Sequence, residues 1–269
     1  MKHDGMVLVD SHCHVSPSWY EPVESLLYQM ERNDVAQAIL IQMMGQEHND
    51  YLLDCLRRFP GTFAAVVIVD VDRPDAPGVL ERLAEQGASG VRLRPGTRSP
   101  GGDPLAIWRA AAGLGLSVSC LGTSDELGSD AFARLIEAVP GLPIVIEHLG
   151  SVSAPDLDSR QQAARLKVFE LARFPNVYIK IPGLGEFCTR AKPAADPFPF
   201  TRPVPPLLER AYDAFGPRRM MWGSDYPPVS SREGYANALR FPMAALAEKS
   251  EDERRLIFGE VAGTVFPIR

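Results

Sequence analysis

Two histidines stand two residues apart directly after an apolar run near the N-terminus. Residues 7–15 read VLVDSHCHV, so His12 and His14 flank Cys13 where the run ends. In an extended strand, residues i and i+2 point to the same side, so both imidazoles aim at one point. Two imidazoles joined by a carboxylate suit a divalent cation such as Zn²⁺, which lowers the pKa of bound water from about 15.7 to about 7. The alternative is a polar turn with hydrogen-bonded imidazoles.

Ionisable or polar residues also stand at or near the ends of several later apolar runs. Unpaired charge beside a core is costly, so packing alone does not explain so many of them. Together with the two histidines they are candidates for one site. These residues are Arg92, Arg94, Glu147, His148, Lys180, Trp222 and Asp225.

Each of these residue types has a defined chemical capacity. Asp225 could accept a proton from an attacking water, and His148 could donate to a developing oxyanion. Arg92 and Arg94 repeat the i, i+2 spacing and could hold a substrate carboxylate, which Lys180 could also do as a point charge. We therefore predict a hydrolytic site for a small anionic molecule.

The same residues also have structural explanations. Asp225 precedes Tyr-Pro-Pro, where a turn or helix-cap aspartate is common. His148 could be a core histidine bonded to backbone. One of the two arginines could pair with Glu147 or another carboxylate as scaffold, and Arg92 has a better claim to function than Arg94. In a regular strand Glu147 points away from its neighbour His148, and this predicts a structural role for Glu147. Trp222 is either a wall of the pocket or core filler.

Eight apolar runs alternate with eight helical stretches along the chain, which predicts a parallel (β/α)8 TIM barrel in the α/β class. The carboxyl ends of the strands then meet at one mouth, where all the candidate residues converge. The whole chain, 1–269, is predicted to be a single domain. The runs cover residues 6–10, 35–42, 62–69, 89–94, 116–121, 142–148, 176–181 and 218–225. The helical stretches cover residues 20–33, 48–59, 76–86, 104–114, 125–139, 159–174, 205–215 and 233–248.

The segment 182–206 interrupts this alternation, being rich in proline and without periodicity. It follows the seventh strand, so it lies at the face where barrel active sites form. Phe187, Phe198 and Phe200 would be unfavourable on a surface, which favours a lid or specificity loop over a solvated excursion.

The composition narrows the class of protein further. The chain has 269 residues, 45% of them hydrophobic, and a net charge of −6, which argues against a nucleic-acid partner. No apolar run reaches the roughly 20 residues of a membrane span, and the first residues lack a signal-peptide pattern. The cysteines form no CxxC pair, so reduced thiols are expected. We predict a cytoplasmic protein that acts on a small molecule, without nucleic-acid or membrane partners and with its oligomeric state open.

Three motifs at the ends of predicted strands resemble the amidohydrolase superfamily: DSHCHV, IEHLG and MWGSDYP. The match is closest to the amidohydrolase-2 branch, which contains lactonases for sugar lactones and for pyrone dicarboxylate. GVRLRPG, NVYIKIPGL and the closing IFGEVAGTVFPI extend the resemblance over nearly the whole chain. It implies a hydrolase that opens a lactone or related cyclic ester of a small carboxylated metabolite. The implied roles are catalysis by Asp225 and His148, metal binding by His12, His14 and Asp225, and substrate binding by Arg92, Arg94, Lys180 and Trp222.

One departure from the superfamily leaves the cofactor open. Metal-binding members usually have a further ligand, commonly histidine, at the end of strand 5. Here that stretch reads LSVSCLGTSD, with Cys120 as its only soft donor and no lysine to carboxylate. Because the branch includes members that work without metal, one divalent cation, most simply zinc, and metal-free catalysis both stay open. A decarboxylase on the same scaffold and a non-catalytic barrel that binds an anionic metabolite are the two competing functions.

Overall fold

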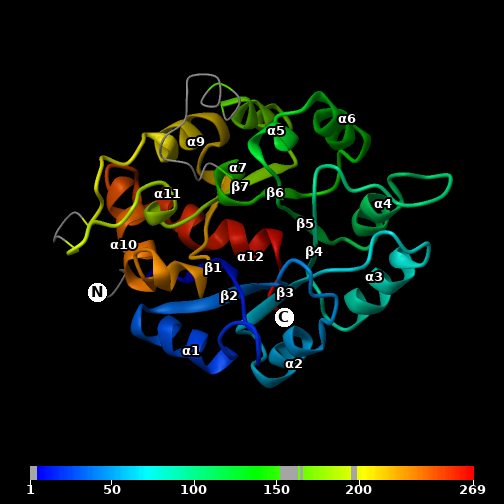
Figure 1. Ribbon diagram of the computed structural model, residues 1–269, viewed down its shortest axis with the longest axis horizontal. Coiled ribbons are helices and arrows are strands. Elements are labelled where there is room, and N and C mark those ends of the chain that lie inside the picture. The colour runs from blue at the N-terminus through cyan, green and yellow to red at the C-terminus, as the bar shows by residue number, and fades with distance from the viewer. Residues whose placement is uncertain (1–4, 152–162, 164–165, 195–198) are drawn as a thin grey trace.

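Eight parallel strands form a nearly closed barrel in which every strand pairs with the next one in the chain (Figure 1). The computed structural model describes residues 5–151, 163, 166–194 and 199–269. Beyond β8, Asp225 N donates to His12 O at 2.9 Å and His14 N to Tyr226 O at 2.7 Å, which joins the last strand to the first. The predicted (β/α)8 TIM barrel is confirmed. The strands are β1 (Leu8–Cys13), β2 (Val35–Ile41), β3 (Phe63–Val67), β4 (Gly90–Leu93), β5 (Ser117–Cys120), β6 (Ile144–Ile146), β7 (Val177–Ile181) and β8 (Met220–Trp222).

Helices surround the barrel between the strands. The predicted stretch 125–139 is divided into α5 and α6, because Ser129 caps a new helix by accepting from Phe132 N at 3.2 Å. The predicted stretch 159–174 lies partly outside the described residues, and its end forms the 3-10 helix η1 (Glu170–Arg173). In the described part of the chain, no helix combines the length and apolarity needed to cross a membrane. The α-helices are α1 (Val23–Arg32), α2 (Asp50–Arg58), α3 (Ala76–Glu85), α4 (Ala106–Gly113), α5 (Ser124–Leu127), α6 (Asp130–Ala138), α7 (His148–Ser151), α9 (Leu207–Phe215), α10 (Tyr235–Ala245), α11 (Glu251–Arg255) and α12 (Val261–Val265).

The C-terminal segment fills the barrel at the amino-terminal ends of the strands. The π-helix η5 (Leu256–Glu260) leads into α12, which lies in the middle of the ring of strands (Figure 1). Ser89 Oγ, just before β4, donates to Pro267 O at 2.8 Å, and Ser117 Oγ at the start of β5 donates to Val265 O at 2.6 Å. This end of the barrel is therefore closed by packed side chains, and the polar residues at the opposite end form its mouth. The inner core consists of Val9, Ile39, Ile41, Ala64, Val66, Val145, Met221, Val261, Ala262, Val265 and Phe266.

The long loop after β7 packs onto the molecule rather than extending from it. It begins with the 3-10 helix η2 (Leu184–Glu186), and Phe187 and Phe200 are buried. The Phe200 ring lies 5.6 Å, centroid to centroid, from Phe241 of α10. Phe198, named with them from the sequence, lies outside the described residues. Burial of Phe187 and Phe200 explains why a proline-rich segment without periodicity contains them.

Candidate active site

The end of β1 brings His12 and His14 to one point inside the mouth. Their Nε2 atoms are 3.2 Å apart and both side chains are buried. Asp10, fully buried beside them, accepts the backbone N–H groups of His12 at 3.1 Å and of Ser224 at 2.8 Å through Oδ1. This carboxylate therefore ties the start of the histidine motif to the segment after β8.

Asp225 approaches the two histidines from that segment. Its Oδ1 lies 3.8 Å from His12 Nε2 and 3.5 Å from His14 Nε2, while Oδ2 accepts from Arg232 Nη1 at 2.8 Å. Gly223 permits this approach, because a Cβ there would lie 2.6 Å from the Cβ of His12. Burial alone raises the pKa of Asp225, but His14, His148 and Arg232 outweigh it and hold the pKa below its usual range. The carboxylate is therefore ionised at neutral pH.

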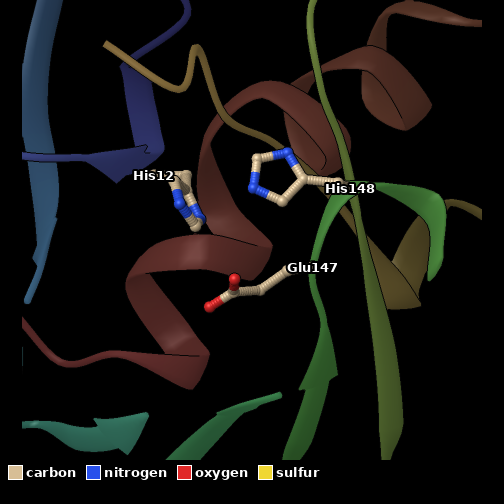
Figure 2. Close-up of side chains that lie close together, drawn as sticks. All are labelled: His12, Glu147 and His148. Carbon is tan, nitrogen blue, oxygen red and sulfur yellow. The ribbon is translucent and has the colours of Figure 1, made fainter. Parts of the chain in front are cut away.

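Glu147 and His148 both turn into the mouth, next to His12 (Figure 2). The expectation that Glu147 points away from His148 is wrong, because β6 ends at Ile146 and His148 adopts a left-handed φ of 49°. Glu147 therefore keeps the alternation of the strand, facing inward like Val145, and His148 is the residue that departs from it. His148 Nδ1 lies 3.0 Å from Glu186 Oε2, and although burial lowers the pKa of His148, Glu186 overcomes this and raises it to about 9.

Arg92 and Glu147 form a buried ion pair across the barrel. Arg92 Nε donates to Glu147 Oε1 at 3.0 Å and Nη2 donates to Oε2 at 2.7 Å, while Nη1 donates to the Gln42 carbonyl at 2.9 Å. Burial raises the pKa of Glu147, but Arg92 and Lys180 reverse this and lower it to about 2. All three guanidinium nitrogens of Arg92 thus have partners within the protein. Arg94 lies beyond the end of β4 and is exposed, outside this group.

Lys180 projects from β7 into the same buried network. Its Nζ donates to Ser119 Oγ at 3.0 Å and lies 3.2 Å from His12 Nδ1. Burial lowers the pKa of Lys180 to about 8, with Glu147 opposing the shift, so the ammonium form predominates at pH 7. Lys180 therefore connects the histidine pair to the Arg92–Glu147 pair.

Trp222 and Cys120 lie outside the mouth. Trp222 is fully buried in the core between barrel and helices, and its Nε1 donates to the Ala238 carbonyl of α10 at 2.8 Å. Cys120 belongs to the same core cluster, where burial raises the pKa of its thiol well above its usual range. Neither side chain joins the residues that the mouth brings together.

The separations of His12, His14 and Asp225 resemble those of metal ligands, because donors around a tetrahedral Zn²⁺ lie roughly 3.3–3.6 Å apart. The hydrogen bonds do not fit. His14 Nδ1 lies 2.7 Å from the Ile41 carbonyl and so carries its proton there, which leaves Nε2 bare as a ligand requires. His12 Nδ1 instead faces the Lys180 ammonium, a group that only donates, so His12 carries its proton on Nε2. This set offers two bare donor atoms, not three.

Two other groups within the described residues have donor atoms close enough to hold an ion: His12, Glu147 and His148, and His148, Glu186 and Asp225. Both Glu147 oxygens already accept from Arg92. His148 Nδ1 and Glu186 Oε2 already contact each other at 3.0 Å. These contacts within the protein occupy donor atoms of both groups.

Three residues near the mouth were not identified from the sequence. Glu186 and Arg232 come from the loops after β7 and β8, and Tyr20 follows β1, with its ring centroid 5.6 Å from that of His14. The signal that could have found them is position, because these loops lie at the carboxyl face where barrel sites are built. Their surrounding sequence has no periodicity that predicts where the side chains point.

Comparison with known proteins places the chain in a family. The sequence model of the family described as Amidohydrolase matches residues 9–268. The chain belongs to the amidohydrolase family. This amidohydrolase is 32% identical over 215 residues to an L-fucono-1,5-lactonase of Burkholderia ambifaria, covering 77% of the present chain and 69% of that protein. A second L-fucono-1,5-lactonase, from Burkholderia multivorans, is 29% identical over 136 residues, 46% of this chain and 43% of the other.

Solved structures share the fold at low sequence identity. An amidohydrolase from Burkholderia multivorans with bound zinc has a TM-score of 0.75 at 21% identity, covering 98% of this chain and 100% of that one. A candidate 2-pyrone-4,6-dicarboxylic acid hydrolase from Pseudomonas putida has a TM-score of 0.75 at 23% identity, with 98% of both chains covered. A 5-carboxyvanillate decarboxylase from Sphingomonas paucimobilis has a TM-score of 0.65 at 16% identity, covering 98% and 100%.

Proposed function

We propose that this amidohydrolase opens a lactone of a small hydroxy acid by attack of an activated water. Its 32%-identical relative is named an L-fucono-1,5-lactonase, which supports a lactone as the substrate class. The observation that carries the proposal is the meeting of Asp225 and His148 in one mouth, where their side-chain donor atoms and that of Glu186 lie within 4.8 Å of one another. A carboxylate with a lowered pKa beside an imidazolium with a raised pKa supplies a base and a hydrogen-bond donor at the same pH.

The reaction requires two events at the lactone carbonyl. Asp225 accepts a proton from water as the water oxygen bonds to the carbonyl carbon, and the carbonyl oxygen becomes an oxyanion. The imidazolium of His148 donates a hydrogen bond to that oxyanion. When the ring carbon–oxygen bond breaks, Asp225 returns its proton to the leaving oxygen, and the product is an open hydroxy acid.

We assign substrate binding to residues other than the Arg92, Arg94, Lys180 and Trp222 expected from the sequence. Arg92 and Lys180 have partners in the buried network, so we assign them to holding the site together. Arg232 is the better candidate for binding a substrate oxygen. Its Nε and Nη2 are buried and have no hydrogen-bond partner among the described residues, while Nη1 orients Asp225. Tyr20, 41% exposed beside His14, offers a ring face for the sugar-like side of a lactone.

We further propose that the reaction proceeds without a metal ion. The hydrogen bonds of the histidine pair support this choice, and His12 and His14 then act as fixed polar walls of the site. Zinc was one alternative expected from the sequence. For His12 to bind zinc through Nε2, its proton would have to move to Nδ1, which faces Lys180 Nζ.

The test is a panel of aldono-1,5-lactones and 2-pyrone-4,6-dicarboxylate, with acid release followed by a pH indicator. Hydroxybenzoic acids are included to detect carbon dioxide release. We expect acid release from at least one lactone, unchanged after chelator treatment. Carbon dioxide release without lactone hydrolysis would identify a decarboxylase, and silence on the whole panel would favour a metabolite-binding barrel. Asp225→Asn protein prepared in parallel controls for contaminating hydrolases.

A further inference from the structure

A chain of hydrogen bonds with a fixed direction runs through the floor of the site. Ser119 Oγ lies 2.7 Å from Glu147 Oε1, an ionised oxygen that only accepts, so the serine hydroxyl donates to it. Ser119 Oγ must therefore accept from Lys180 Nζ, 3.0 Å away. This contact identifies Lys180 as a donor independently of its neighbour His12.

The direction continues through both histidines. The Lys180 ammonium has no lone pair, so His12 Nδ1, 3.2 Å away, accepts from it and the His12 proton lies on Nε2. His14 Nδ1 donates to the Ile41 carbonyl at 2.7 Å, which leaves His14 Nε2 as an acceptor. The two Nε2 atoms are 3.2 Å apart, one with a proton and one without. Every donor in the sequence Lys180, His12, His14 and Ile41 meets an acceptor.

We infer that Lys180 is a positioning residue that sets the tautomer of His12 and thereby prevents the histidine pair from acting as a two-ligand metal site. A histidine that ligates through Nε2 normally donates its Nδ1–H to a carbonyl or carboxylate. His14 has such a partner in Ile41, whereas His12 faces an ammonium. Ligation by His12 would move its proton onto Nδ1, directly against the N–H groups of Lys180.

Burial makes this arrangement hard to relax. Lys180 is 2% exposed and His12 is 1% exposed, so water cannot replace either partner. The Lys180 ammonium also lies 5.3 Å from the ring centroid of Phe266, which closes the barrel beneath it. The side chain thus has little room to turn away from His12 when an ion approaches.

The experiment measures metal binding without any substrate, so its outcome is independent of the proposed lactone hydrolysis. Chelator-treated wild type and Lys180→Leu proteins are titrated with Co²⁺, followed by visible absorption, and with Zn²⁺, followed by calorimetry. We expect Lys180→Leu to bind both ions at least about tenfold more tightly than wild type, the scale on which partners of ligating histidines act. Leucine supplies neither a donor nor a metal ligand, so His12 is free to change tautomer.

Two controls test whether the tighter metal binding of Lys180→Leu arises from the contact between Lys180 and His12. Lys249→Leu removes an ammonium that packs on the Tyr212 ring, outside the site, and is expected to bind metal as wild type does. Adding His12→Ala to Lys180→Leu is expected to abolish the gain. Equal affinity in wild type and Lys180→Leu, or a gain that persists without His12, would overturn the inference.

A second measurement uses the unaltered protein and decides the matter even where the leucine variant fails to fold. Nitrogen-15 NMR of labelled histidines, assigned with His12→Gln and His14→Gln proteins, reports which ring nitrogen carries the proton. We expect His12 protonated on Nε2 and His14 on Nδ1 in chelator-treated wild type. A His12 proton on Nδ1 contradicts the role given to Lys180.

Discussion

Arg92 and Glu147 meet through two parallel hydrogen bonds inside the barrel, Nε to Oε1 at 3.0 Å and Nη2 to Oε2 at 2.7 Å. Ser119 adds a third donor to the Glu147 carboxylate. The pair joins β4 to the end of β6, and through Ser119 it reaches Lys180 and the histidines. The residue that sequence spacing suggested for a substrate carboxylate therefore stabilises the floor of the site.

Arg92→Met is expected to destabilise the fold strongly. It leaves the Glu147 carboxylate buried without its main partner, a loss that typically costs about 3–5 kcal/mol. The free energy of unfolding in urea measures the effect. Arg73→Ala breaks an exposed ion pair with Asp75 and serves as the control, with little change expected. Equal losses in the two variants would mean that the buried pair contributes no more than a surface one.

Glu186→Gln is expected to shift the alkaline limb of activity downward. The Glu186 carboxylate is the main group that raises the pKa of His148 to about 9 from its ordinary value of 6.5. In wild type, hydrolysis should fall as pH rises through about 9, where the imidazolium loses its proton. The variant should lose activity at lower pH, which a profile of kcat against pH records. Coinciding profiles would exclude protonated His148 from the reaction.

The same pKa shift has a consequence for stability. Because the folded-state pKa of His148 is raised, its pairing with Glu186 stabilises the fold fully below pH 6.5 and loses this contribution as pH rises through about 9. Glu186→Gln should therefore lower the free energy of unfolding at pH 6 more than at pH 9.5. Urea denaturation of both proteins at the two pH values measures the difference, and an equal loss at both would contradict it.

Gly185→Ala is expected to disturb the loop that holds Glu186. A Cβ at residue 185 would lie 1.9 Å from Glu233 Oε2 and 2.6 Å from its Cδ, and Glu233 is buried. Relieving this overlap should cost about 1–3 kcal/mol and move Glu186 from His148, lowering kcat. Gly102→Ala is the matched control, since no described atom lies within 4 Å of its added Cβ. Unchanged kcat and stability at both positions would show that the loop adapts freely.

The barrel was predictable because each strand carries its own signal. Buried parallel strands are continuous apolar runs, and runs such as 62–69 and 176–181 contain the observed β3 and β7. The i, i+2 spacing of His12 and His14 also predicted that their side chains come together, since β1 stays extended through Cys13. Local periodicity predicted this pair even though the register of β1 against β2 shifts between Asp10 and Cys13.

The pairings among the side chains at the mouth could not be predicted, because they depend on where each strand ends. Glu147 continues the inward alternation of Val145, and the left-handed backbone at His148 turns that imidazole to the same side, which no residue pattern predicts. Arg94 lies one residue past the end of β4, so the spacing it shares with Arg92 carries no common direction. Partners such as Glu186 reach the site from loops whose path depends on long-range packing. The sequence therefore predicts which residues gather at the mouth better than which of them pair.

The most direct test of the account is the turnover of a lactone by Asp225→Asn protein. The amide keeps the size of the side chain but cannot accept the proton of the attacking water. We expect kcat to fall by about 10²–10⁴, the usual contribution of a general base, with KM changed little. Asp213→Asn, on the exposed face of α9, should retain wild-type kcat. Near wild-type kcat in the Asp225→Asn protein would contradict the proposed mechanism.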